Sequence, residues 1–174
     1  TAADAFAPAS APREDWLEVN RVARETTDAM REVLWLVGAR QEMGIDLAAH
    51  LKLAATRMLP SRTVRWTGDG EPLPATWSAD TRRHVFLFFK EALANIARHS
   101  SAMTIELSLR PPTAGFFELV IADDGCGFDP ATVNRGVGLH SLRDRARAVG
   151  GACIIDTAPG RGTRVTLRVP VPMD

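Results

Sequence analysis

The sequence lacks an excess of either charge, because its 21 acidic residues equal its 21 lysines and arginines. Proteins that bind nucleic acid or anionic membranes through their general charge carry a basic surplus, so the composition argues against both classes. No apolar run approaches the ~18 residues that a membrane-spanning helix needs. Tyrosine is also absent, and we attach no function to that absence.

Cysteine is scarce, with only Cys126 and Cys153. The two are far apart, no Cys-x-x-Cys motif is present, and no histidines follow at metal-ligand spacing. This pattern argues against a zinc site and favours a reducing compartment. Because the sequence starts at Thr1 rather than at methionine, we expect a fragment. It would be the cytoplasmic part of a longer protein, and a membrane-spanning segment elsewhere in that protein could anchor it to a membrane.

The 174 residues and the hydrophobic content of 45% fit one domain with an appendage. Residues 1–13 are rich in alanine and proline and predict a disordered linker. Residues 14–60 predict a helical region, in which the apolar stripe from Glu14 to Val37 needs a partner. Residues 61–174 predict the main domain.

Helices and strands alternate in that main domain. One helix is expected from a Ser78 cap to about His99, and another from Leu139 to Val149. A turn is expected at 111–115, and strands are expected at 63–66, 103–110, 116–122, 153–157 and 163–170. Because hairpins link most strands, the sequence predicts an α+β fold: a two-layer α/β sandwich whose mixed or antiparallel sheet has helices on one face.

The helix expected after Ser78 carries a narrow polar stripe. At roughly 100° per residue, Asn95, Arg98 and His99 fall within about 80° of Glu91. Asn95 offers a neutral oxygen that Mg²⁺ accepts, Glu91 could orient or deprotonate a nucleophile, and the basic pair could meet phosphates. A solvated face is the plain alternative. The opposite, apolar face comprises Val85, Phe86, Phe89, Leu93, Ile96 and Ala97.

The segment DDGCG follows the strand expected to be central. When ionised, Asp123 can only accept hydrogen bonds, so it suits a ligand with an amino group, such as adenine rather than guanine. Gly125 and Gly127 permit positive φ and close approach of the backbone to a flat ligand. A simple Asp-Gly turn between strands is the alternative.

The segment GVGL, Gly136–Leu139, opens the next helix. Its free N–H groups could bind an anion such as a phosphate, whereas a flexible loop is the alternative. The preceding eight residues, 128–135, could fold over a ligand as a lid. In GRGT, the hydroxyl of Thr163 could bond a base edge, although a plain hairpin turn is the alternative.

These segments occur in one order that resembles the GHKL ATPase superfamily. KEALANIARHS resembles its N box, DDGCG its G1 box and GVGL its G2 box. The short lid and the ending PGRGTRVTLRVP resemble sensor histidine kinases of the subfamily that includes nitrate and membrane-fluidity sensors. The resemblance covers residues 78–170. Residues 19–37 also resemble the second helix of that subfamily's dimerisation hairpin.

The resemblance implies the Bergerat ATP-binding fold with ATP and Mg²⁺ as cofactors. Asp123 would accept from the adenine amino group, with Thr163 in support through a water. Asn95 would hold Mg²⁺, and Glu91 would assist proton handling near the γ-phosphate as the catalytic residue. The implied ATP-binding residues are Asn95, Arg98, His99, Asp123, Gly125, Gly127, Gly136, Val137, Gly138, Leu139 and Thr163.

The sequence departs from this subfamily at the phosphoacceptor, which is a histidine followed by aspartate. None of His50, His84, His99 and His140 is followed by an acid. The acceptor helix is therefore expected outside the fragment, unless the protein no longer autophosphorylates.

We expect the ATP-binding catalytic part of a histidine kinase, with its own phosphoacceptor helix, a second copy and a cognate response regulator as partners. Two alternatives stay open: a serine kinase of the anti-sigma-factor type, and a non-catalytic, nucleotide-gated interaction module. The N-terminal helices argue against the serine kinase, which needs no dimerisation hairpin.

Overall fold

A computed structural model describes residues 47–68, 74, 76–131 and 137–171 of the chain. The predicted linker of residues 1–13 and the predicted stripe from Glu14 to Val37 lie outside these residues. No helix in the described ranges is long and apolar enough to cross a membrane.

The described helices and strands follow the predicted order. The helices are α2 (Leu47–Met58), α3 (Ala79–Asn95), the π-helix η1 (Ile96–Ser100) and α4 (Val137–Ala148). The strands are β1 (Thr63–Thr67), β2 (Thr104–Thr113), β3 (Phe116–Asp123), β4 (Ala152–Thr157) and β5 (Thr163–Pro170).

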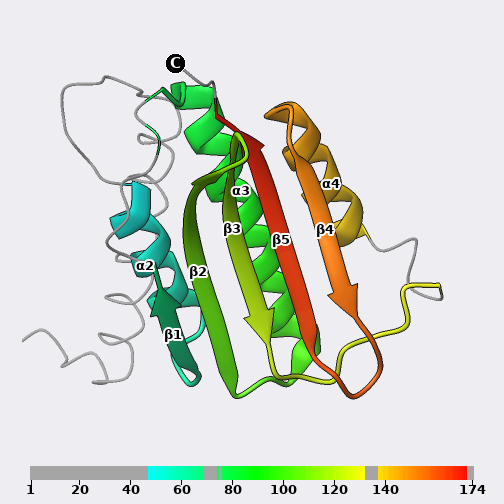
Figure 1. The fold of residues 1–174 in the computed structure, drawn as a ribbon. Helices are drawn as coiled ribbons and strands as arrows, with labels where there is room; N and C mark the ends of the chain where they lie inside the picture. The colour runs from blue at the N-terminus through cyan, green and yellow to red at the C-terminus, as the bar shows by residue number, and fades with distance from the viewer. Residues whose placement is uncertain (1–46, 69–73, 75, 132–136, 172–174) are drawn as a thin grey trace, which may run out of the picture. The chain divides into compact units, whose positions relative to one another are not determined.

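The strands form one five-stranded sheet in the order β1-β2-β3-β5-β4. β1 pairs with β2 in parallel, and the other neighbours are antiparallel. Figure 1 shows α3 and α4 on the same face of the sheet, behind it in this view. The predicted two-layer fold with a mixed sheet is confirmed, and β3 is central as expected.

The core lies between the sheet and α3. Along β3, the alternate residues Phe117, Leu119 and Ile121 are almost completely buried, because successive side chains of a strand point to opposite faces. Phe89 and Leu93 of α3 are also fully buried. Each such side chain contributes about 1.5–3 kcal/mol through burial. This packing fixes α3 against the sheet.

The two ends of α3 differ from each other. At its start the Oγ of Ser78 accepts from the N–H of Thr81 at 3.0 Å, which confirms the predicted cap. At its end the helix does not stay α-helical to His99, because residues 96–100 form a π turn. The wider turn rotates side chains away from their expected directions. Ala97, expected in the core, is exposed.

Two other boundaries differ from the prediction by more than one residue. β2 continues through residues 111–113, where a turn was expected, and the turn is formed by Ala114 and Gly115, both with positive φ. The pairing with β3 shifts register between Arg110 and Thr113, which accommodates prolines that cannot donate to the ladder. α4 begins at Val137, two residues earlier than expected.

Candidate functional site

Two polar side chains of α3 lie against the first turn of α4. A Cβ placed on Gly138 would lie 2.7 Å from the Oδ1 of Asn95 and 3.0 Å from the Oε1 of Glu91. A real Cβ would have to displace at least the nearer side chain. Glycine therefore lets the two helices meet here, and the structure brings three predicted site residues together.

The amide of Asn95 does not behave as part of a solvated face. Its Nδ2 is buried, and among the residues that the structure describes it has no hydrogen-bond partner. Leaving such a donor unpaired costs about 1–3 kcal/mol. The plain alternative of a solvated stripe thus fails for Asn95, and an oxygen of a ligand beside α4 would satisfy the donor.

The predicted basic pair lies on η1 rather than on an extension of α3. The side chains of Arg98 and His99 are both exposed. His99 contributes its backbone, since its carbonyl oxygen accepts from the Sγ of Cys126 at 3.2 Å. The structure therefore leaves both side chains exposed to solvent.

A second group of predicted residues lies where β3 ends and β5 begins, at the lower edge of the sheet in Figure 1. Asp123 ends β3 and pairs with Thr163, the first residue of β5. Its Oδ1 accepts from the N–H of Gly125 at 2.9 Å. Gly125 lies so close to the carbonyl oxygen of Ser100 that a Cβ would collide with it. Gly127 adopts a φ of +57°.

Burial raises the pKa of the Asp123 carboxyl above its ordinary value of 3.8, and the neighbouring Asp124 adds to the rise. The N–H of Gly125 and the charge of Arg62 act in the opposite direction. In such partly dry surroundings a carboxylate forms stronger hydrogen bonds than in water. Asp123 is therefore placed to accept from a ligand's amino group.

Asp124, unlike Asp123, has a structural role. Its Oδ1 accepts from the N–H groups of Met103 at 2.8 Å and of Thr104 at 2.9 Å. Backbone donors, chiefly Thr104, hold the pKa of this carboxyl below its ordinary value. Asp124 thus fastens the loop after β3 to the start of β2.

The π-helix η1 joins the two groups of site residues. The N–H of Cys126, in the loop after Asp123, donates to the carbonyl oxygen of Ser100 at 2.7 Å. Ser100 ends η1, which directly follows Asn95. η1 therefore connects the two groups at the C-terminal end of α3.

A hydroxyl pair that the sequence did not suggest supports Thr163. The Oγ1 of Thr157 lies 3.1 Å from the Oγ1 of Thr163 and donates to the carbonyl oxygen of Gly162 at 2.9 Å. It also accepts from the N–H of Phe128 at 3.1 Å. Thr157 pairs directly with Thr163 across the hairpin. Counting that hairpin register in the sequence would have identified it.

Part of the predicted anion site lies outside the described residues. Gly136 of that site is not described, and neither are residues 132–135 of the predicted lid. Gly138 and Leu139 lie in the first turn of α4, which begins at Val137. The N–H groups of a first helical turn have no partner within the helix. They lie close to Asn95 and Glu91 because Gly138 does.

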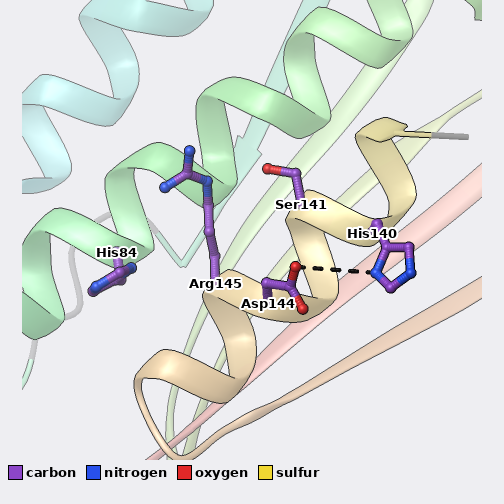
Figure 2. A pocket seen from close by; sticks show the side chains of 5 residues that line it. All are labelled: His84, His140, Ser141, Asp144 and Arg145. Carbon is purple, nitrogen blue, oxygen red and sulfur yellow. Dashed lines mark ion pairs between the residues drawn. The ribbon is translucent and has the colours of Figure 1, made fainter.

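A separate cavity of about 390 Å³ lies between α3 and α4 (Figure 2). Its acid, Asp144, already pairs with Arg147 at 2.9 Å and lies 4.0 Å from the Nδ1 of His140. No predicted site residue lines this cavity, so we do not assign the site to it. The lining residues are His84, His140, Ser141, Asp144 and Arg145.

A sequence model of the histidine kinase-, DNA gyrase B-, and HSP90-like ATPases matches residues 80–173, more than half of the chain. The chain belongs to this ATPase family. The matched region contains both groups of site residues and leaves out α2 and β1. The predicted superfamily is confirmed, whereas the subfamily of nitrate and fluidity sensors stays a prediction.

Relatives of this ATPase-family chain include an uncharacterized sensor-like histidine kinase of Chloroflexus aurantiacus, 41% identical over 93 residues, which are 50% of this chain and 16% of that protein. UhpB of Salmonella typhimurium, a signal transduction histidine-protein kinase/phosphatase, is 31% identical over 144 residues, 82% of this chain and 28% of that protein. The chain thus spans less than a third of these curated relatives.

Among solved structures, the crystal structure of the ATP binding domain of PrrB from Mycobacterium tuberculosis matches with a TM-score of 0.57 and 26% identity. The match covers 74% of this chain and 93% of that domain. Since nearly all of that domain is matched, the sheet and helices described above correspond to the fold of an ATP-binding domain of this family.

The residues of this ATPase-family site fit a magnesium ion held mainly by its nucleotide. Within the described ranges, no group of three or more His, Cys, Asp or Glu side chains could hold a metal. Mg²⁺ bound by one protein oxygen, with phosphate oxygens and waters as its other ligands, needs no such group. In Asn95 the Oδ1, which faces Gly138, is the atom that could ligate the ion, whereas the buried, unpaired Nδ2 could donate to a phosphate oxygen.

Proposed function

We propose that this chain is the ATP-binding catalytic part of a sensor histidine kinase. It binds Mg·ATP and transfers the γ-phosphoryl group to a histidine outside the chain. The observation that carries the proposal is the connection, through η1, of the Asp123 group with the Glu91 and Asn95 group. Both relatives described above are named as histidine kinases, which favours this function over an anti-sigma-type serine kinase.

At the base end of the site, Asp123 accepts a hydrogen bond from the adenine amino group. Guanine presents a carbonyl oxygen at that place, so an ionised carboxylate rejects it. Gly125 and Gly127 let the loop after Asp123 pack closely on the backbone of Ser100 and Ala158, which holds that loop beside the carboxylate. Thr163, supported by Thr157, supplies a hydroxyl beside the carboxylate.

At the phosphate end, Asn95 would hold Mg²⁺, and the N–H groups at the start of α4 face the phosphates. A bound Mg²⁺ would neutralise charge on the phosphate oxygens. Glu91 orients the incoming imidazole and takes up its proton. The exposed Arg98 and His99 meet phosphate oxygens once the nucleotide is bound. The domain's contribution is positioning and electrostatics, with little covalent chemistry.

The four histidines of this chain are unsuitable acceptors. None precedes an acid. His50 packs edge-on against Phe86, and the Nε2 of His84 lies 3.6 Å from Asp80. The partners in this proposal are therefore a phosphoacceptor helix outside the chain, a second copy in the full-length dimer and a response regulator, all in the cytosol.

A labelling experiment tests this function. The 174-residue chain is incubated with Mg·ATP labelled at the γ-phosphate, alone and with the full-length protein carrying an inactivating Glu91→Gln substitution. We expect binding without self-labelling, and label on a histidine of the full-length partner. Stable phosphate on this chain itself would contradict the proposal.

A further inference from the structure

Arg62 lies on the short connection between α2 and β1, outside the residues matched by the family. Its Nη1 donates to the carbonyl oxygen of Ile96 at 2.9 Å, and its Nη2 donates to that of Ala97 at 3.3 Å. Nη1 also lies 3.4 Å from the Oγ of Ser100. Carbonyls at a helix C-terminus lack donors within the helix and favour a cation. The guanidinium of Arg62 thus binds backbone carbonyl oxygens of η1.

The course of η1 in turn sets the position of the loop after Asp123. The carbonyl oxygens of His99 and Ser100 accept from the Sγ and N–H of Cys126. Gly125 packs on Ser100 with no space for a Cβ. A change in η1 would therefore move the loop relative to α3.

We infer that Arg62 is a positioning residue for nucleotide binding, which holds η1 so that Asp123 and Asn95 keep a fixed relation. This inference rests on the proposed function of ATP binding. Arg62 contacts the backbone of η1, and it acts on the nucleotide through that backbone. Its guanidinium suits the task because its forked donors reach two carbonyl oxygens at once.

The charge of Arg62 provides a readout that a merely structural role would lack. The guanidinium lowers the pKa of Asp123, opposing burial and the charge of Asp124. The other basic side chains near this end of α3, Arg98 and His99, are exposed. Removing the charge of Arg62 raises the pKa of Asp123 further. The ionised acceptor is then lost at a higher pH as the solution is acidified.

Calorimetric titration of Mg·ATP at several pH values tests the inference on the wild-type chain, Arg62→Gln and Arg62→Lys. We expect Arg62→Gln to bind about tenfold more weakly, as for the loss of one charge-assisted hydrogen bond, and to lose affinity at a higher pH. Arg62→Lys keeps the positive charge, so affinity should fall at the same pH as in wild type. It should recover only part of the affinity, because an ammonium lacks the paired donors of the guanidinium. Arg65→Gln, on the exposed side of β1, serves as the matched control and binds as wild type.

Thermal unfolding of the same samples shows whether weaker binding of a variant comes from a loss of folded protein or from a change in the folded site. Wild-type affinity in Arg62→Gln would overturn the inference. Weaker binding would also overturn it if affinity were lost at the same pH as in wild type and if Arg62→Lys did not restore binding. Failure of the wild-type chain to bind Mg·ATP would overturn the proposed function and this inference with it. Binding by wild type that is unchanged in Arg62→Gln would overturn the inference alone.

Discussion

Gly138 of α4 and Asn95 of α3 are so close that a Cβ on the glycine would lie 2.7 Å from the asparagine Oδ1. The two residues come from segments more than forty positions apart, and the lid region lies between them in sequence. Their proximity places the start of α4 beside the polar stripe of α3. It also gives a substitution that separates the fold from the site.

Gly138→Ala should weaken Mg·ATP binding about tenfold while leaving the fold intact. The added methyl displaces the side chains of Asn95 and Glu91, yet alanine in a helix is more favourable than glycine by about 1 kcal/mol. Titration calorimetry and thermal unfolding measure the two effects. His140→Ala, on an exposed position of α4, is the control for changes in that helix. Unchanged binding by Gly138→Ala would refute the assigned role of this contact.

Asp123→Asn should raise stability at neutral pH relative to wild type. Burial raises the pKa of Asp123 in the folded state above its ordinary 3.8. The folded chain therefore binds the proton more tightly than the unfolded chain, and its free energy of unfolding falls as pH rises above 3.8. Asparagine lacks this ionisation, so the difference in unfolding free energy between variant and wild type should grow in the variant's favour upward from that pH. Urea unfolding from about pH 4 to pH 7 measures it, and a difference that shrinks with rising pH is the opposite result.

Glu91→Gln should retain Mg·ATP binding and lose phosphoryl transfer by about 10²–10⁴-fold, the usual contribution of a general base. Glutamine keeps the size of the side chain beside Gly138 and removes its basicity. Single-turnover transfer in the full-length protein measures the loss. Glu106→Gln, on an exposed position of β2, should transfer normally. Wild-type phosphoryl transfer by Glu91→Gln would show that Glu91 is not the general base.

Thr157→Val should lower the free energy of unfolding by about 1–3 kcal/mol, because the partly buried partners of the hydroxyl lose their hydrogen bonds. Those partners are the N–H of Phe128 and the carbonyl oxygen of Gly162. Binding of Mg·ATP should weaken as well, since Thr163 loses its neighbour. Thr166→Val on β5, a half-buried threonine elsewhere on the same strand pair, is the control. Equal stability of both variants would contradict the structural role of Thr157.

Local signals in the sequence were sufficient for most of the fold. The Ser78 cap and the strand at residues 163–170 depend on neighbouring residues, and both were predicted correctly. The π turn at 96–100 was not, because it depends on tertiary partners. The donors from Arg62 and the loop that rests on Ser100 come from distant parts of the chain.

The candidate site shows the same division. The sequence selected Glu91 and Asn95 from a helical period, and the structure places both beside Gly138. It missed Thr157 and Arg62, since a threonine that ends a strand and an arginine in a short connection carry no motif. The place of Thr157 opposite Thr163 follows from the hairpin register, whereas the bonds of Arg62 to helix carbonyls become visible only when the chain is folded.

The most direct test is calorimetric titration of Mg·ATP into the 174-residue chain and into Asp123→Ala. Loss of a hydrogen bond to a charged group should weaken binding by about 1.5–3 kcal/mol, roughly tenfold to a hundredfold. We expect wild type to bind Mg·ATP and neither protein to bind GTP. A wild-type chain that does not bind Mg·ATP, or an Asp123→Ala chain that binds it equally well, would contradict an adenine site at the end of β3.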